Sequence, residues 1–450
     1  MDIVAWSVPA GKRAQGAPPA KKEKKRRRKG VGLTMLITEF GAAADGRLCT
    51  EAIQRAIDAA AAQGGGRVVV PAGDYLTGGL VLRSHVELHL EAGSTLRFTD
   101  DFDAYPVLRL RWEGWEQESH RPLIYARGEE HVSVTGSGTL EGQGRKWWTA
   151  FRAGEMKAAR PCFVCFEECR HVLMADFTLR NSPAWSIHPV ACENVGVRGL
   201  TIINPYDSPN TDGIDPESCR GVRISDCYVD VGDDCIAIKA GTEDCDRLIP
   251  CEDITITGCT MVHGHGGVVL GSEMSGSIRR VSIAGCVFDG TDRGIRIKTR
   301  RGRGGSVEDI CVTGLIMHDV LCPVVVNSMY FCGKGGKDPV VTDLRALPVN
   351  EGTPHVRRIL IADCIVTGAR SAAGCIYGLP EAPIEDFSIL NTTVHLVKAE
   401  PEVPVMNALA RPVTCAGLTA EHVRGLTLRN FRITGAEGDA IVLHDAETTD

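Results

Sequence analysis

A nine-residue pattern that recurs along most of the chain limits its fold more than any other feature. Apolar residues occupy its fourth and sixth positions, and Gly, Asp or Asn usually occupies the eighth. Alternating apolar and polar residues predict a half-buried strand in each copy. From Cys169 to Val307 the copies start 23, 27, 32, 27 and 29 residues apart, an interval that predicts a solenoid with one copy in each coil. The clearest copies are CRHVLMADF from Cys169, CENVGVRGL from Cys192, CRGVRISDC from Cys219, CEDITITGC from Cys251, IRRVSIAGC from Ile278, VEDICVTGL from Val307, VRRILIADC from Val356, IEDFSILNT from Ile384 and VRGLTLRNF from Val423.

We therefore expect an all-β fold over residues 35–450, a single-stranded right-handed parallel β-helix. Fifty glycines and only 5% aromatic residues suit a repeat with many turns. Apolar residues at helical spacing from Ile53 to Ala60 predict one helix, which Gly64–Gly66 would end. That helix would cap the N-terminal coil, whose backbone edge and core are otherwise open. Cysteines at the first and ninth positions of several copies are expected to form ladders of thiols inside the coils.

Residues 1–34 have a different composition from the rest. Residues 1–33 carry ten Lys and Arg against two acids, whereas the whole chain has a net charge of −7, so the remainder carries about −15. We expect a disordered basic tail, and Met35 is an alternative start of the folded part. Because the remainder is acidic, no nucleic-acid partner is expected.

The sequence also carries information on membrane insertion, on the cellular compartment and on metal binding. No run of 18 apolar residues occurs, so no transmembrane helix or membrane partner is expected. The amino terminus lacks the pattern of a classical signal peptide, which predicts a cytoplasmic protein whose eighteen cysteines are thiols. Cys162, Cys165 and Cys169 are interpreted as buried thiols, because no fourth ligand of suitable spacing accompanies them. No metal or other cofactor is predicted, and the oligomeric state is left open.

Three carboxylates are the first candidate catalytic residues. Asp212 precedes Asp233 and Asp234 by about one expected coil, so a strand spacing of about 4.8 Å would bring them onto one patch. In such a cluster the pKa of at least one carboxyl rises. One acid and one base are what glycoside hydrolysis requires. Asp215, three residues past Asp212, is predicted to be a turn residue.

Two further motifs follow on neighbouring coils. One is His263–Gly267, which contains His265, and the other is Arg296–Ile297–Lys298, which is followed by Arg300 and Arg301. Alone, each motif is more typical of a turn or a solvated strand face. Their order on consecutive coils favours one groove, and cations beside acids suit an anionic sugar, because Arg can bind a carboxylate with two hydrogen bonds.

The motifs Asn210–Gly213, Gly232–Asp234, Gly264–Gly266 and Arg296–Lys298, on a pectate-lyase-like solenoid, resemble glycoside hydrolase family 28, the polygalacturonases. The resemblance implies inverting hydrolysis of α-1,4-galacturonosyl linkages in pectic oligo- or polygalacturonate. It further implies a role for each site residue. Asp233 would be the general acid, Asp212 and Asp234 would act on water, and His265 would support the acid; the substrate would be bound by Asn210, Arg296 and Lys298, with Arg300, Arg301, Trp185 and His188 as further candidates.

The stretches GGVVLGSEMSG and RIKTRRGRGG look more like the bacterial exo-acting members of that family. Long loops expected at Phe102–Arg121 and Gly333–His355 could close one end of the groove, which favours release of single units from the non-reducing end. A rhamnogalacturonan or xylogalacturonan hydrolase of the same family is an alternative. A calcium-dependent pectate lyase, with Asp233 and Asp234 as metal ligands, and a non-catalytic binding solenoid are less favoured.

Overall fold

The computed structural model describes residues 33–449, so the predicted basic tail lies outside the described residues except for its last two. Those two residues, Leu33 and Thr34, belong to strand β1 (Leu33–Leu36), which pairs with β2. The solenoid therefore begins two residues before the predicted boundary at Met35.

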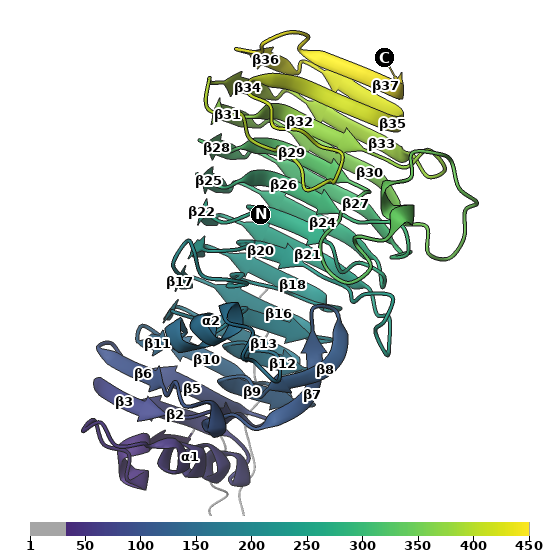
Figure 1. Ribbon diagram of the computed structural model, residues 1–450. Coiled ribbons are helices and arrows are strands. Elements are labelled where there is room, and N and C mark those ends of the chain that lie inside the picture. The colour runs from purple at the N-terminus through teal and green to yellow at the C-terminus, as the bar shows by residue number, and fades with distance from the viewer. Residues whose placement is uncertain (1–32, 450) are drawn as a thin grey trace, which may run out of the picture. The chain divides into compact units, whose positions relative to one another are not determined.

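The described chain is a parallel β-helix, as predicted, in which most coils contribute strands to three stacked ladders (Figure 1). The first and third ladders join through β35 into a 19-stranded sheet, and four N-terminal strands continue the third ladder as a separate sheet. The 19-stranded sheet comprises β1, β2 (Gly66–Val70), β5 (Val86–Leu90), β10 (Ser133–Gly136), β13 (Arg170–Ala175), β16 (Glu193–Arg198), β18 (Arg220–Ser225), β20 (Ile236–Ile238), β21 (Cys251–Thr257), β23 (Val268–Gly271), β24 (Ile278–Ala284), β26 (Arg293–Lys298), β27 (Ser306–Thr313), β29 (Cys322–Asn327), β30 (His355–Ala362), β32 (Ala372–Tyr377), β33 (Ile384–Leu390), β35 (Ala416–Arg429) and β37 (Ile441–Thr448).

The second ladder is a 12-stranded sheet. It comprises β3 (Gly73–Thr77), β6 (Ser94–Phe98), β11 (Thr139–Glu141), β14 (Thr178–Arg180), β17 (Thr201–Ile203), β19 (Tyr228–Val231), β22 (Thr260–His263), β25 (Val287–Asp289), β28 (Ile316–His318), β31 (Ile365–Ala369), β34 (Thr393–Leu396) and β36 (Arg432–Thr434). The four-stranded sheet comprises β4 (Leu80–Val81), β9 (Ile124–Arg127), β12 (Val164–Glu167) and β15 (Ile187–Val190).

Helix α1 (Thr50–Ala62) lies across the N-terminal end of the β-helix, as the sequence predicts (Figure 1). Its apolar face packs into the core, which buries Ile53 and Ile57 completely. A second helix, α2 (Arg145–Arg152), and the short 3₁₀ turns η1 (Ile37–Phe40), η2 (Phe102–Ala104) and η3 (Pro339–Thr342) lie in connections. Among the described residues, no helix is long and apolar enough to span a membrane.

The nine-residue pattern has a clear backbone explanation. Its eighth residue adopts positive φ in every copy, for example 55° at Asp226 and 63° at Gly258, and Gly, Asp and Asn tolerate this conformation best. Its first-position cysteines stack inside the coils, because the amide of Cys192 lies 3.4 Å from the sulfur of Cys219, and that of Cys219 lies 3.3 Å from the sulfur of Cys251. The predicted thiol ladder is therefore present.

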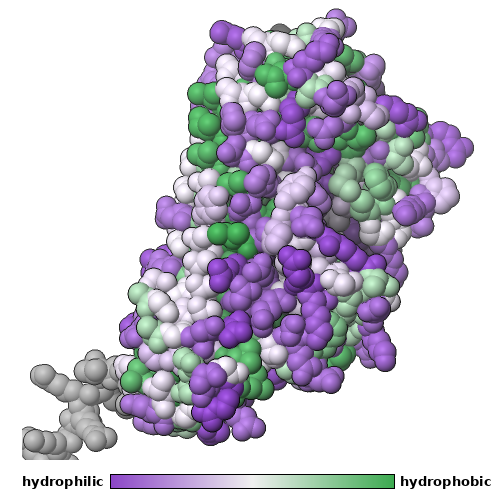
Figure 2. Space-filling model, turned by 60° about the vertical axis from the view of Figure 1, so that its left-hand side comes forward, coloured by the Kyte–Doolittle hydropathy of each residue, from purple (hydrophilic) through white to green (hydrophobic). Residues whose placement is uncertain are grey.

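Two connections project from the same side of the β-helix (Figure 1). One is an antiparallel hairpin of β7 (Val107–Trp112) and β8 (Trp115–His120), and the other is the long connection 328–354 between β29 and β30. On the face shown in Figure 2, hydrophilic residues cover most of the surface and hydrophobic ones form small separate patches.

Candidate active site

The three predicted carboxylates lie together where the second ladder turns into the third. The amide of Gly213 donates to the carbonyl of Asp234 at 3.0 Å, which holds the Asp212 segment directly beside the next coil. One oxygen from each of Asp212, Asp233 and Asp234 lies within 4.8 Å of the others. The prediction that one coil separates the acids is confirmed.

Asp234 is held as a carboxylate by two cations from β26. Lys298 Nζ lies 2.7 Å from one of its oxygens and Arg296 Nη1 lies 3.2 Å from the other. Burial alone would raise the pKa of Asp234, which is 1% exposed, but the two cations lower it well below its usual range. The two cations therefore favour the ionised form of Asp234.

Asp212 has the opposite electrostatic environment. It is buried, and its pKa is raised well above the usual range by burial and by the neighbouring charges of Asp233 and Asp215. Asp215 is itself buried below Asp212, and burial raises its pKa to about 8. The prediction that Asp215 is a turn residue is wrong, because the coil directs its side chain inward, where Lys239 Nζ lies 3.6 Å from both aspartates.

Asp233 is the most accessible of the three acids. Its carboxylate lies 3.3 Å from Nδ1 of His265, and this hydrogen bond raises the pKa of His265. Asp233 is also a close neighbour of Asp212, and its charge is one of the causes that raise the pKa of Asp212. The site thus combines a carboxylate paired with two cations, Asp234, and a buried acid of raised pKa, Asp212.

The nearest oxygens of the three acids lie within 4.8 Å of one another. Inverting glycosidases usually separate their two carboxyl groups by roughly 6.5–9.5 Å, a distance between whole groups rather than between their nearest oxygens. The direct backbone pairing between the two coils sets the spacing here. The same three oxygens could also hold a divalent cation, although both oxygens of Asp234 already contact Lys298 or Arg296.

These carboxylates line a cavity of about 190 Å³ that also takes in Asn210 and Trp185. Asn210 Oδ1 accepts a hydrogen bond of 2.6 Å from Arg160, which orients its side chain. The full lining consists of Glu113, Trp115, Trp185, Asn210, Asp212, Asp233, Asp234, Lys239, Thr242, Asp244, Ser272, Glu273, Lys298, Arg303, Tyr330, Cys332, Gly333 and Lys334.

Comparison with known proteins identifies the family. Residues 62–350 match the glycosyl hydrolases family 28. A probable polygalacturonase from Vitis vinifera is 33% identical over 427 residues, which cover 90% of this chain and 85% of that protein. The chain belongs to glycosyl hydrolases family 28.

Solved structures agree with this assignment. An exopolygalacturonase from Thermotoga maritima superposes with a TM-score of 0.77 at 32% identity, over 90% of this chain and 92% of that chain. A family 28 exopolygalacturonase from Yersinia enterocolitica has a TM-score of 0.75 at 22% identity, over 92% of this chain and 78% of that chain, which shows a shared fold. The family assignment makes this chain a glycoside hydrolase, and the acid cluster is its candidate active site.

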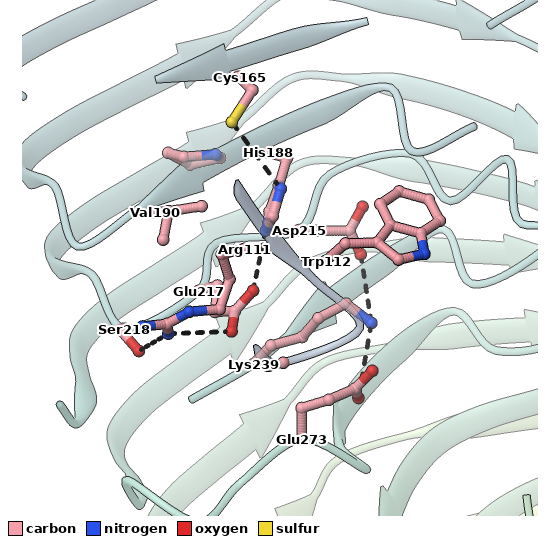
Figure 3. A network of polar contacts seen from close by, with 12 residues as sticks. Arg111, Trp112, Cys165, His188, Val190, Asp215, Glu217, Ser218, Lys239 and Glu273 are labelled. Carbon is pink, nitrogen blue, oxygen red and sulfur yellow. Dashed lines mark hydrogen bonds and ion pairs between the residues drawn. The ribbon is translucent and has the colours of Figure 1, made fainter. Parts of the chain in front are cut away.

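Three substrate-binding candidates are placed differently from the prediction. His188 is completely buried, and its ring lies 4.8 Å from that of Trp185. It bonds Glu217 at 2.9 Å (Figure 3), so it cannot contact a substrate. Arg300 is buried and pairs with Glu243, and the buried Arg301 pairs with Glu381. Neither arginine lines the cavity, because the chain leaves β26 in a turn that directs both guanidinium groups into the adjoining loops.

The cations of the Arg296–Lys298 motif occupy different positions. Lys298 lines the cavity, and its ammonium group keeps donors free after its bond to Asp234. Arg296 is buried behind Asp234 and also contacts the sulfur of Met406. A uronate in the cavity could therefore bind Lys298 directly, whereas Arg296 acts on Asp234.

Sequence reasoning did not assign Lys239, Glu113 or Glu273 to the site. Lys239 follows the buried strand β20 without interruption, and a charge at the end of an apolar strand was the available signal. Glu273 belongs to the GSEM stretch whose role was left open. Glu113 has no sequence signal, because a hairpin from a distant part of the chain brings it to the cavity.

Proposed function

We propose that this glycoside hydrolase cleaves galacturonosyl linkages of pectic chains from one end. The two relatives above with at least 30% identity are named as a polygalacturonase and an exopolygalacturonase, which supports a galacturonan substrate. Lys239, Lys298, Arg303 and Lys334 line the cavity and supply positive charge for an anionic sugar. The observation that carries the end-wise mode is a wall of three segments at one side of the acids.

The wall joins the β7–β8 hairpin to residues 239–250. The amide of Thr242 donates to the carbonyl of Gly114 at 2.8 Å, and the amide of Asp246 donates to Glu116 at 2.9 Å. Arg109 adds an ion pair with Asp246 at 3.1 Å. The hairpin tip is thereby held over the cavity.

The connection 328–354 completes the wall. Lys334 pairs with Asp244 at 2.9 Å and lies 5.0 Å from the ring centre of Trp115, so it links all three segments. Glu243 of the second segment pairs with both Arg300 and Arg303. A polymer that had to pass through the site would meet these segments, whereas a chain end could enter and stop there.

We propose that cleavage occurs in one displacement by water, with inversion. Both oxygens of Asp234 contact cations and Asp212 is buried, so only Asp233 is accessible enough to protonate the leaving oxygen. Asp212 and Asp234, which also line the cavity, would then hold the attacking water, and the ionised Asp234 would accept its proton as the leaving oxygen takes the proton of Asp233. Proton NMR of the first product formed tests this step, and appearance of the retained anomer would refute it.

A time course on polygalacturonate tests the end-wise mode. Viscosity and reducing ends are followed together, and the products are separated by size. We expect single galacturonate units from the start, with viscosity falling only slowly. A steep loss of viscosity while few bonds have been cut would mean internal cleavage and would refute the proposal.

Two modified substrates test which end of the chain the enzyme attacks. Oligogalacturonides reduced at the reducing end should be hydrolysed normally, whereas oligomers blocked at the non-reducing end should resist. The reverse preference would place the closed side of the cavity at the reducing end.

A lyase is the alternative with an observation in its favour, since Asp212, Asp233 and Asp234 lie close enough to hold a cation. Lyase products absorb in the ultraviolet and a chelator stops their formation. Hydrolysis would leave ultraviolet absorbance unchanged and would continue in chelator.

We also propose that the enzyme works in the cytoplasm on short fragments. All eighteen cysteines are free thiols and fifteen are buried, which suits a reducing compartment. Fractionation of the source cells followed by assay of each fraction tests this, and activity confined to the medium would refute it.

A further inference from the structure

We propose that Glu113, at the tip of the β7–β8 hairpin, is a specificity-determining residue that binds the free 4-hydroxyl group of the terminal sugar. A sugar inside the chain carries the next residue on that oxygen, so Glu113 would recognise a chain end by its chemistry as well as by its shape. The inference rests on the end-wise hydrolysis proposed above, and it adds a hydrogen-bonding group to the closed side of the cavity.

The backbone at the hairpin tip is unfavourable for the residue that it carries. Trp112 pairs with Trp115, so Glu113 and Gly114 form a two-residue turn, and their φ angles are 50° and 84°. Positive φ at both positions is typical of a type I′ turn, in which Asn, Asp or Gly is preferred at the first position. Glutamate has no such preference, so its presence there indicates a role for the side chain.

The strands behind the tip are fixed by buried contacts. Arg111 is buried and forms an ion pair with Glu217 at 3.2 Å (Figure 3). The ring of Trp112 is stacked on that of Trp185 at 4.6 Å. These contacts hold the hairpin against the third ladder, so Glu113 is carried on a well-defined support.

The tip itself is packed against the cavity wall. The carbonyl of Gly114 accepts a hydrogen bond of 2.8 Å from the amide of Thr242. A Cβ on Gly114 would lie 2.7 Å from the side chain of Thr242 and 2.8 Å from that of Glu273, so the turn has almost no space to shift toward them. A side chain on such a support loses little conformational freedom when it binds a ligand.

The Glu113 carboxyl group is available for a ligand. Its side chain is exposed, and it lines the cavity. Among residues 33–449 it has no hydrogen bond or ion pair, whereas Arg111 and Glu116 of the same hairpin pair with each other at 2.7 Å.

The cations that line the cavity do not neutralise Glu113 directly, because each has another acidic partner. The pairs are Lys239–Asp212, Lys298–Asp234, Arg303–Glu243 and Lys334–Asp244. An acid that stays unpaired beside four cations suits a neutral hydrogen-bond donor of the substrate, and sugar hydroxyl groups are such donors.

A terminal galacturonate would place different groups against the two sides of the cavity. Asp233, the proposed acid, acts on the glycosidic oxygen at C1, and C4 lies opposite C1 across a pyranose ring. Glu113 enters the cavity from the hairpin, whereas Asp233 enters from a turn after the second ladder. With C1 at the acids, the 4-hydroxyl group would face the wall that carries Glu113, and the sugar carboxylate would be attracted by the cations.

The test compares trigalacturonate with its analogue that lacks the 4-hydroxyl group of the non-reducing residue. In the unaltered enzyme, a hydrogen bond from this hydroxyl to a charged group should make kcat/KM for trigalacturonate higher by a factor of about 10 or more. Glu113→Ala should remove most of this factor, because kcat/KM should fall for trigalacturonate and stay unchanged for the analogue. Glu113→Gln, which keeps an acceptor, should retain part of the difference.

Glu113→Asn separates the side chain from the backbone of the turn. Asn tolerates positive φ better than Glu, so the melting temperature should not fall. The shorter side chain should nevertheless lose the discrimination between the two substrates. This variant also decides the question where Glu113→Ala does not fold.

Glu118→Ala is the matched control. Glu118 is an exposed acid on β8 of the same hairpin, and it does not line the cavity. This variant should hydrolyse both substrates as the unaltered enzyme does.

Two results would overturn the proposal. Equal losses on both substrates in the Glu113 variants would show that this residue only shapes the wall. Unchanged discrimination in Glu113→Ala or Glu113→Asn would show that the 4-hydroxyl group binds elsewhere. Internal cleavage of polygalacturonate by the unaltered enzyme is a different result, because it would refute the end-wise function itself.

Discussion

Replacement of Arg301 by Met separates an anchoring role from substrate binding. Arg301 forms two hydrogen bonds with Glu381, at 2.6 and 2.9 Å, and donates to the carbonyls of Val340, Asp343 and Arg345 in the connection 328–354. The Arg301 and Glu381 side chains are 5% and 4% exposed. Removal of one partner from a buried ion pair costs about 3–5 kcal/mol, because the other charge stays buried alone.

We therefore expect Arg301→Met to lower the free energy of unfolding by about that amount, or to release the connection locally. Thermal unfolding and limited proteolysis between Gly333 and His355 measure the two effects. The double variant Arg301→Met/Glu381→Leu should recover much of the loss, because it leaves no unpaired charge. Arg345→Met is the control on the same connection, since its ion pair with Asp343 is exposed.

The competing expectation is that Arg301 binds the substrate, as the sequence motif indicated. In that case Arg301→Met would raise KM by a large factor, leave thermal unfolding unchanged and gain nothing from Glu381→Leu. That combination of results would refute the anchoring role.

Three further predictions follow from the site. Asp233→Asn should reduce kcat by a factor of about 10²–10⁴ without a change in melting temperature, because the substitution is isosteric and the side chain is accessible. Gly264→Ala should reduce kcat far more than Gly290→Ala: both glycines have φ near 70°, but an added Cβ would lie 2.6 Å from the carbonyl of Asp233 at Gly264 and no closer than 3.6 Å to another group at Gly290. Although burial alone would raise the pKa of Glu381, Arg301 lowers it below its ordinary value of 4.5. The stability difference between wild type and Arg301→Met should therefore be full above that pH and shrink in acid, as urea unfolding at several pH values would show.

The fold and the acid cluster could be predicted because both depend on a periodic signal. The alternation at the fourth and sixth positions of each copy sets which side chains enter the core, and the repeat interval sets the register between coils. Once the register is known, Asp212 must lie beside Asp234, as the bond from Gly213 to Asp234 shows. His265 and Lys298 follow on the next two coils by the same rule.

The errors concern side chains whose direction the period does not determine. Asp215 and Lys239 lie at the ends of very short strand segments, where the coil turns and a polar residue can point inward without breaking the pattern. Arg300 and Arg301 follow β26 in a turn, and their partners Glu243 and Glu381 come from other coils. Such pairs depend on tertiary contacts, so local sequence could not identify them.

The motifs of this site contain both turn-forming glycines and candidate catalytic side chains. Asn-Thr-Asp-Gly and Gly-His-Gly are typical of turns, and the structure shows why the glycines are needed there. A Cβ on Gly213 would lie 2.4 Å from the carbonyl of Cys235, and one on Gly264 would lie 2.6 Å from that of Asp233. Each glycine therefore lets one coil approach the next closely enough to set its acid or histidine against the neighbouring carboxylate. The same closeness places Asp212 within 4.8 Å of Asp233 and 3.6 Å from Lys239, so the compact turns bring the acids and a buried cation into one cluster.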